Sequence, residues 1–428
     1  MPQRNVLAIF IAVLVSVLCY FESGRSRYAA VLADAINTIS DNYVEPIEPR
    51  ELFESAMHGM VDQLDPYSGF MPPVDYTQFN QDMQQEFAGV GIEVGLEDGQ
   101  LTVMNPLPGM PAFEAGVRSG DKIVAVDGTP TDGFRPDDAV GLIQGEIGTK
   151  VTLTVARANS PDTLDITIER ARITVESIKG DRRDTNGNWI FTLEQDPQVG
   201  YIRIRSFSER TASELRDTLR SLNGNIDGLI LDLRNNAGGL LLGAIEICDM
   251  FLPEGELIVS TKRRDAKPDP VFARETPIVP SDWKMVVLVD RFSASAAEIF
   301  AACLQDHQMA KVVGERSWGK GSVQTVIRME SGRSALRLTT ASYWRPSGRN
   351  IHRFEGATEA DEWGVTPDEG LTVTLDPETD TQRYLEMLQQ RRLRDAIPNS
   401  PDEEYAPWND PQLDKALDVV MEMLEDKN

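Results

Sequence analysis

Ser295 and Lys320 are two residues whose types could together support hydrolysis of an acyl bond. Lys320 follows Ser295 by 25 residues. A serine attacks an acyl carbon only when a base removes its proton, and a lysine can be that base if burial lowers its pKa to roughly 7–8. The chain has three histidines, His58, His307 and His352, and none lies in a recognisable triad motif. The residue types therefore favour a serine–lysine pair.

The segment around Ser295 predicts a turn between a strand and a helix. Met285–Val289 is an apolar run that predicts a buried strand, and Ala296–His307 has the apolar spacing of a helix. Ser295 would then take the N-cap position, beside free N–H groups and the positive end of the helix. An N-cap serine often only caps, so its position alone does not make it a nucleophile. Ser293 could compete, but its place before the cap favours a role in shaping the turn.

Lys320 lies between Gly319 and Gly321, which let neighbouring backbone approach closely. If a strand begins there, Lys320 and Gln324 point to the same face, because strand side chains alternate. A base and a polar orienting group would then project together. A lysine in a glycine-rich turn can also bind phosphate, but the phosphate-binding pattern Gly-x-x-x-x-Gly-Lys-Ser/Thr is missing from this segment.

Both segments resemble those of the carboxyl-terminal processing (tail-specific) proteases. The family's nucleophile segment is similar to Ser-Ala-Ser-Ala-Ser/Ala-Glu-Ile, and this chain has Ser293–Ile299 in the matching place. The family's lysine segment is similar to Gly-Glu-x-Thr/Ser-x-Gly-Lys-Gly-x-x-Gln, which Gly314–Gln324 matches. One departure is Ala297, where many members have serine. The similarity runs from about Ala35 to about Thr374.

This resemblance implies roles for three side chains. Ser295 would be the nucleophile, Lys320 the general base and Gln324 the residue that positions the lysine. The reaction would pass through an acyl-enzyme that water then hydrolyses, and it would require no metal or cofactor.

Two backbone N–H groups should form an oxyanion hole. Ala296 follows the nucleophile at the helix start and is one candidate donor. The second candidate lies after the predicted strand Gly228–Leu233, in a loop that resembles the family's Asp-Leu-Arg-x-Asn-x-Gly-Gly turn. That resemblance makes Gly238 or Gly239 the second donor, and the sequence does not choose between them. Without it, the loop would be interpreted as a plain turn that uses glycine for positive φ.

Residues from Glu86 to about Arg157 resemble a PDZ domain. Such domains bind a peptide C-terminus by adding it as a strand, while backbone N–H groups hold its carboxylate. Pro136–Gln144 would be the helix beside the peptide groove. The predicted peptide-binding residues are the carboxylate loop and two apolar positions of that helix: Gly89, Val90, Gly91, Ile92, Val140 and Ile143.

Composition excludes some partners. The net charge of −26 argues against nucleic acid and against adhesion to anionic lipid through a basic patch. Three cysteines do not make a disulfide framework. Val6–Phe21 is a largely apolar run preceded by Arg4, and the residues after it are poor for signal-peptide cleavage. We therefore expect an uncleaved signal anchor. Arg25 and Arg27 weaken the charge argument for its orientation, so it is partly the family resemblance that implies an exported chain, anchored to the membrane on the periplasmic or extracytoplasmic side.

The expected organisation has five parts. Residues 1–26 form the anchor, 27–85 a helical region with a structural or dimerisation role, and 86–160 the PDZ domain. Residues 161–375 form the serine protease core and 376–428 a charged tail with one helix, Pro411–Glu425. Alternating strands and helices in the core predict an α/β fold with a mostly parallel, ClpP/crotonase-like sheet.

The sequence thus predicts a serine endopeptidase that cuts exported proteins in or near their C-terminal regions. Its expected partners are protein or peptide substrates with free C-termini and the membrane, with an adaptor protein and further copies of the chain as candidates. A non-catalytic PDZ scaffold is the alternative from another class, and intact Ser295, Lys320 and Gln324 argue against it. An α/β acyl hydrolase acting on small thioesters is a second alternative, which the PDZ domain disfavours.

Overall fold

A computed structural model describes residues 27–84, 86–97, 99–158, 160, 162–358, 360–375, 381–398 and 408–426. The expected anchor Val6–Phe21 lies outside these residues. Within them, no helix is both long enough and apolar enough to cross a membrane. The chain divides into two compact units, residues 1–76 with 324–339, and residues 77–323 with 340–428.

The first unit is mainly helical. Residues 27–42 are helical, and α2 (Pro49–Val61) begins with a proline, which suits the first helical turn because it has no N–H to satisfy. Strand β1 (Gly69–Met71) pairs antiparallel with residues 335–337 of β20 (Ser334–Trp344). Phe53 of α2 packs edge-to-face on Phe70 of β1, with ring centroids 5.9 Å apart. Strand β19 (Ser322–Met329) and helix α3 (Pro73–Gln84), like β20, continue into the second unit.

The predicted PDZ segment forms its own sheet and apolar core within the second unit. Strands β3, β4, β5, β7 and β8 lie in that order, and β6 pairs with β5. Helices α4 (Pro111–Glu114) and α5 (Pro136–Ile143) complete the module. The strand bounds are Ile92–Glu97, Gln100–Pro106, Lys122–Val126, Thr129–Pro130, Lys150–Ala156 and Leu164–Glu169, from β3 to β8. Strands β2 (Glu86–Gly89) and β9 (Ala171–Thr174) form a separate antiparallel pair.

The predicted protease core is built on a five-stranded sheet in the order β10-β13-β14-β17-β18. Its bounds are Ile178–Lys179, Val199–Ile204, Gly228–Asp232, Lys284–Val289 and Ala310–Gly314. The last four strands are parallel, and β10 is antiparallel to β13. Strands β13 and β14 are buried throughout, as expected when both faces of a parallel sheet are covered. The PDZ sheet and the β1–β20, β15–β16 and β15–β20 pairs are antiparallel. Among the described strands, parallel strand pairing therefore occurs only in the core sheet, and the prediction of a mostly parallel sheet holds for that sheet alone.

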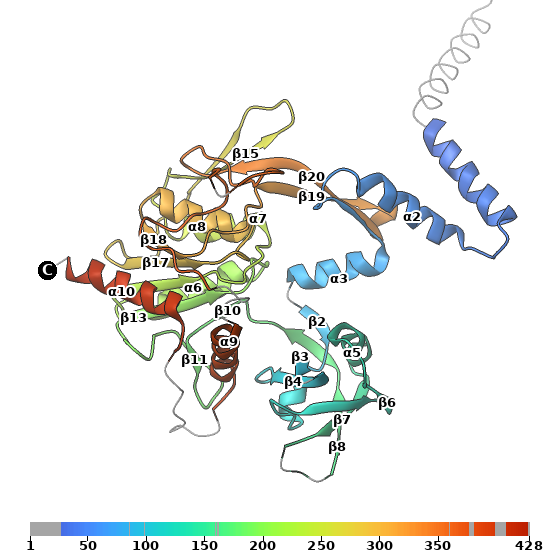
Figure 1. Cartoon of the computed structure of the whole chain (residues 1–428), viewed down its shortest axis with the longest axis horizontal. Helices are drawn as coiled ribbons and strands as arrows, with labels where there is room; N and C mark the ends of the chain where they lie inside the picture. Colours follow the sequence, from blue (N-terminus) through green and yellow to red (C-terminus); the bar gives the residue numbers. More distant parts are fainter. Residues whose placement is uncertain are drawn as a thin grey trace, which may run out of the picture. The chain divides into compact units, whose positions relative to one another are not determined.

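Helices cover both faces of this sheet (Figure 1). Helices α6 (Thr211–Leu222), α7 (Leu241–Asp249) and α8 (Ala296–Asp306) share one apolar cluster with alternate strand residues such as Val287. Helix α10 (Pro411–Glu425) packs on the opposite face, against neighbours such as Val286 and Leu288. The segment predicted as a charged tail therefore supplies the second helical layer of the core.

The remaining elements differ from the predictions in detail. Strand β15 (Leu257–Arg263) pairs with β16 (Asp269–Phe272) and β20, and β11 (Arg182–Arg183) pairs with β12 (Trp189–Ile190). Helix α9 (Thr381–Asp395) precedes α10, where we expected one helix in residues 376–428. A short 3-10 helix, η1 (Glu330–Gly332), joins β19 to β20.

Candidate active site

Ser295 lies between β17 and α8 in a strained backbone conformation. Its φ of 58° and ψ of −116° are values that residues with a Cβ rarely adopt, and such strain is concentrated at functional sites. The neighbouring Ser293 is fully buried and donates from Oγ to the Leu233 carbonyl at 2.9 Å, while accepting from the Asp290 N–H at 2.9 Å. Ser293 therefore fixes the turn, and Ser295 remains the candidate nucleophile.

The Ser295 hydroxyl contacts a tyrosine. Its Oγ lies 3.0 Å from Oη of Tyr343, a buried residue on β20. The Tyr343 N–H donates to the carbonyl of Gly321 at 3.0 Å, next to Lys320. Tyr343 therefore joins the serine turn to the lysine segment. No local spacing in the sequence indicates this contact, because the two residues lie 48 positions apart in the chain.

A buried carboxylate holds the two segments together. Glu298 is fully buried in the first turn of α8. Its Oε2 accepts from the N–H groups of Ser295 and Lys320, both at 2.8 Å. Its Oε1 accepts from the Gly319 N–H at 2.7 Å and from the Ser317 hydroxyl at 2.5 Å. Burial raises the pKa of Glu298 to about 7, although these hydrogen bonds act to lower it.

Lys320 precedes β19, which begins at Ser322. The predicted alternation of Lys320 and Gln324 along one strand is therefore wrong, because Lys320 lies in the loop. Gln324 donates from Nε2 to Thr339 Oγ1 at 3.2 Å, and both residues belong to the first unit. Lys320 belongs to the second unit. The Lys320 backbone is held to the Ser295 turn through Glu298, whereas Gln324 belongs to the first unit.

The loop between β14 and α7 lies directly against the serine. A Cβ on Gly238, whose φ is 99°, would be 2.7 Å from the Cβ of Ser295. Asn236 shapes this loop: its Nδ2 donates to the Ile204 carbonyl at 2.7 Å, and its Oδ1 accepts from the Gly238 N–H at 2.8 Å. The Asn236 carbonyl also accepts from the Ala294 N–H at 2.9 Å. Glycine is required here because any side chain would displace the serine turn.

The backbone N–H groups of Gly238 and Gly239, the two candidates for the second oxyanion donor, differ in their hydrogen bonds. The Gly238 N–H is directed at the Asn236 side chain. Within the described part of the chain, the Gly239 and Ala296 N–H groups have no intramolecular acceptor. A Cβ on Gly239, whose φ is 144°, would lie 2.2 Å from the Phe207 carbonyl oxygen, so this position also requires glycine.

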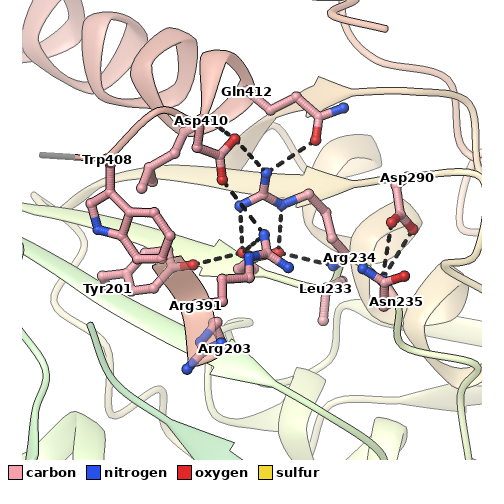
Figure 2. Close-up of polar contacts among 12 residues, drawn as sticks. Tyr201, Arg203, Leu233, Arg234, Asn235, Asp290, Arg391, Trp408, Asp410 and Gln412 are labelled. Carbon is pink, nitrogen blue, oxygen red and sulfur yellow. Dashed lines mark hydrogen bonds and ion pairs between the residues drawn. The ribbon is translucent and has the colours of Figure 1, made fainter. Parts of the chain in front are cut away.

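The base of this loop is held by a buried cluster of charges centred on Arg234 (Figure 2). Arg234 makes two hydrogen bonds to Asp232, Nε to Oδ1 at 2.9 Å and Nη2 to Oδ2 at 2.7 Å. Its Nη1 contacts Asp410 Oδ1 at 2.8 Å. Tyr201 donates to Asp232 at 2.7 Å, and Arg391 lies 3.3 Å from the same Asp232 oxygen. Asp232 and Arg234 are the first and third residues of the segment that resembles the family's Asp-Leu-Arg-x-Asn-x-Gly-Gly turn, and the pattern alone predicts no role for either side chain.

The predicted PDZ groove has an available strand edge. Among the described strands, β3 pairs only with β4, so its other edge can accept a peptide strand. Gly91 has a φ of 79°, and a Cβ there would lie 2.4 Å from Cβ of Met110, so the loop requires glycine. Of the two predicted helix positions, Val140 is half-buried and Ile143 lies in the PDZ core. Gly89 and Val90 are also buried, and Ile92 begins β3 and is half-buried.

The chain matches three family models, one after another along its sequence. Residues 23–73 match the model of the activating protease CtpB N-terminal domain, 102–157 the PDZ domain, and 198–370 peptidase family S41. The chain is 36% identical over 353 residues to the carboxy-terminal-processing protease of Bartonella bacilliformis, covering 81% of this chain and 76% of that protein. It is 33% identical over 361 residues to the carboxy-terminal processing protease CtpA of Bacillus subtilis, covering 81% and 74% of the two chains.

A solved structure shows the same fold. It is a Bacteroides fragilis protein described as an S41 protease, with a TM-score of 0.52 and 16% sequence identity, covering 89% of this chain and 92% of that one. The chain therefore belongs to the carboxy-terminal-processing protease family, the serine-type peptidases of family S41 that carry a PDZ domain.

Proposed function

We propose that this protease is an endopeptidase that cleaves exported proteins in or near their C-terminal regions, using Ser295 as nucleophile and Lys320 as general base. The observation that carries the proposal is the shared Glu298 carboxylate, which holds the backbones of Ser295 and Lys320 at 2.8 Å from one oxygen atom. Lys320 takes the proton from the Ser295 hydroxyl as Oγ attacks the peptide carbonyl. The resulting ammonium then protonates the departing amine, and water hydrolyses the acyl-enzyme by the same route. Gln324 is the proposed orienting partner of Lys320.

The N–H groups of Gly239 and Ala296 are the proposed oxyanion donors. Both are free of intramolecular acceptors within the described part of the chain, whereas the Gly238 N–H is held by Asn236. Fixed donors of this kind stabilise the charge that develops on the attacked carbonyl oxygen. Gly238 would then contribute by having no side chain, because it lies directly against Ser295.

The PDZ domain is the proposed sensor of substrate C-termini. The open edge of β3 can take up a peptide strand, and the loop Gly89–Ile92 can present N–H groups to its carboxylate. A substrate tail that binds better to the active state than to the resting state would raise activity; equal affinity for both would change nothing.

We further propose that the chain is exported and anchored in the membrane through Val6–Phe21, and that the core is of the ClpP/crotonase-like class. An adaptor protein and self-association are proposed partners, since residues 23–73 match the model of an activating protease's N-terminal domain. The four parallel strands between two helical layers support the core assignment.

Substitution of the two proposed reactive residues tests the chemistry. Ser295→Ala and Lys320→Ala should each lower turnover of casein by at least about 10³-fold while the melting temperature stays near that of the unmodified protein, since nucleophile and base act as a unit. Ser281→Ala and Lys262→Ala, both at exposed positions, are matched controls that should keep full activity. Near-normal turnover by Ser295→Ala would show that the dyad is wrongly assigned.

A pair of peptides tests the PDZ proposal. One substrate peptide is made as the free acid and as the C-terminal amide, which lacks the charge that the loop binds. The free acid should be cleaved faster by the intact protein. Equal rates would mean that the PDZ domain does not sense C-termini.

A further inference from the structure

Arg234 joins the loop beside the candidate nucleophile to the C-terminal segment of the chain. It lies two residues after the end of β14, and its side chain is buried. Two carboxylates contact it: Asp232, which is a neighbour in sequence, and Asp410, which is 176 residues away. Gln412 adds a third contact, in which its Oε1 accepts from the same Nη1 at 3.0 Å. Figure 2 shows Asp410 and Gln412 side by side, both in contact with the Arg234 guanidinium.

Asp410 is built into this position. Its side chain is fully buried, and Oδ1 also accepts from the Leu413 N–H at 3.1 Å, which caps the start of α10. Helix α10 in turn packs on the sheet through an apolar cluster. Arg391 of α9 lies 3.6 Å from Asp410 and 3.3 Å from Asp232, so two arginines face two aspartates. Burial acts to raise the pKa of Asp410, but Arg234 and Arg391 hold it below its ordinary value.

The loop that follows Arg234 depends on where Arg234 is fixed. The Asn235 N–H donates to the Asp290 carboxylate at 3.1 Å, and Asn236 holds both the Gly238 N–H and the Ala294 N–H. These contacts continue directly into the Gly238–Gly239 turn against Ser295. A shift of the Arg234 side chain would therefore be transmitted to the proposed oxyanion donor within five residues of chain.

We propose that Asp410, which lies outside the matched peptidase region 198–370, is a positioning residue for the oxyanion loop and acts through Arg234. This inference rests on the proposed Ser295 mechanism. It assigns the C-terminal segment a part in the reaction: the segment completes the set of contacts that fixes Gly239 relative to the nucleophile.

Kinetic measurements distinguish a positioning role of Asp410 from a purely stabilising one. Asp410→Asn removes the ion pair with Arg234 at nearly constant volume. We expect kcat on a peptide substrate to fall about 10- to 100-fold, KM to change by less than about 3-fold, and the rate of Ser295 labelling by a fluorophosphonate to fall in parallel, because that reaction also needs the oxyanion donors. Asp418→Asn, an exposed position on α10, is the matched control and should be silent in all three measurements.

A double substitution covers the case in which Asp410→Asn unfolds. Asp410→Asn removes one carboxylate from the buried charge cluster and leaves a positive charge uncompensated, so this single variant should lose stability. Asp410→Asn with Arg391→Gln restores neutrality, and we expect its melting temperature to recover while kcat and the labelling rate stay low. A folded single or double variant whose kcat and labelling rate lie within 2-fold of the unmodified protein would overturn the proposal.

Ser295→Ala in the otherwise unmodified chain separates this inference from the proposed function. If that variant is inert and the Asp410 variants are fully active, only the positioning role fails. If Ser295→Ala itself retains turnover, the proposed mechanism fails, and the role of Asp410 in it fails as well.

Discussion

The backbone N–H groups of Ser295 and Lys320 donate to the same oxygen of one buried carboxylate, each at 2.8 Å. Glu298 therefore fixes the position of the Ser295 backbone relative to the Lys320 backbone, without using either side chain. An acceptor with two oxygens can satisfy all four donors that face it, two on each oxygen. This relationship makes Glu298 the most informative single position to change.

Glu298→Gln should impair both stability and turnover. An amide replaces one acceptor oxygen by an N–H donor, so two of the four donors would face a donor in place of an acceptor. We expect a loss of roughly 1–3 kcal/mol in the free energy of unfolding and a fall in kcat of at least about 10-fold. Urea denaturation and steady-state kinetics measure the two effects. The exposed Glu246→Gln on α7 is the control, and a Glu298→Gln variant as stable and active as that control would contradict the assigned role.

Glu298 should also give the stability a dependence on pH. Its pKa is raised to about 7 in the folded protein from an ordinary value of 4.5, so the folded state binds the proton more tightly. The stabilisation from that proton is complete below about pH 4.5 and is lost as the pH rises to about 7, by roughly 3 kcal/mol at most. The difference in unfolding free energy between the unmodified protein and Glu298→Gln should therefore decrease from pH 5 to pH 7. A difference that stays constant over that range would show that the carboxyl group is already ionised at pH 5.

Tyr343→Phe should slow the reaction without unfolding the protein. The ring remains in place, and only the hydroxyl 3.0 Å from Ser295 Oγ is removed. We expect kcat to fall about 10-fold, equivalent to about 1.4 kcal/mol, because the serine hydroxyl loses a partner that restricts its rotation. Tyr43→Phe, at an exposed position, serves as the control. An increase in kcat would instead identify Tyr343 as a residue that holds the serine inactive.

Gly238→Ala should abolish activity, whereas Gly224→Ala should not. Both glycines have positive φ, 99° and 79°. The methyl group at Gly238 would lie 2.7 Å from Ser295 Cβ, while the one at Gly224 would have no neighbour within 4 Å. We expect about 1 kcal/mol of destabilisation and normal kcat for Gly224→Ala, because only the backbone conformation is penalised. Residual kcat in Gly238→Ala above about one hundredth of normal would mean that the serine turn can shift to accept it.

The proposed anchor makes a prediction about extraction. Full-length protein should remain with membranes through a wash in 1 M salt. At that salt concentration charge interactions are screened beyond roughly 3 Å, whereas burial of the anchor in hydrocarbon does not depend on charge. Protein starting near Ser26 should be recovered in solution and be active. Native protein found in solution without its first ~25 residues would indicate a cleaved signal peptide.

Elements that are set by local pattern were predicted closely from the sequence. The helix expected at Pro411–Glu425 has those bounds, and the strand expected at Met285–Val289 begins one residue earlier. The pattern Thr211-x-x-Glu214 is typical of a capping box that opens a helix, but Arg210 is the N-cap of α6. The Thr211 hydroxyl instead accepts from the Ser208 N–H at 2.9 Å, because a tertiary turn competes for the same group.

Contacts between distant parts of the chain could not be predicted in this way. The Arg234–Asp410 pair joins residues 176 apart, and the Ser295–Tyr343 contact spans 48. Neither pair follows from a helical or strand period, because burial and charge balance between separate elements select them. Glu298 stands in the motif that predicts Ser295 as the nucleophile, yet its contacts depend on a loop 19 to 22 residues further on.

The second helical layer has a consequence for how the protease is made. Helix α10 and Asp410 follow the serine and lysine segments in the chain and so leave the ribosome after them, yet they cover one face of the sheet and contact Arg234. A nascent chain that has completed the serine and lysine segments still lacks this layer. Proteolytic competence should therefore arise only after synthesis has passed residue 425, which delays self-cleavage and damage to neighbouring proteins until this helical layer can form.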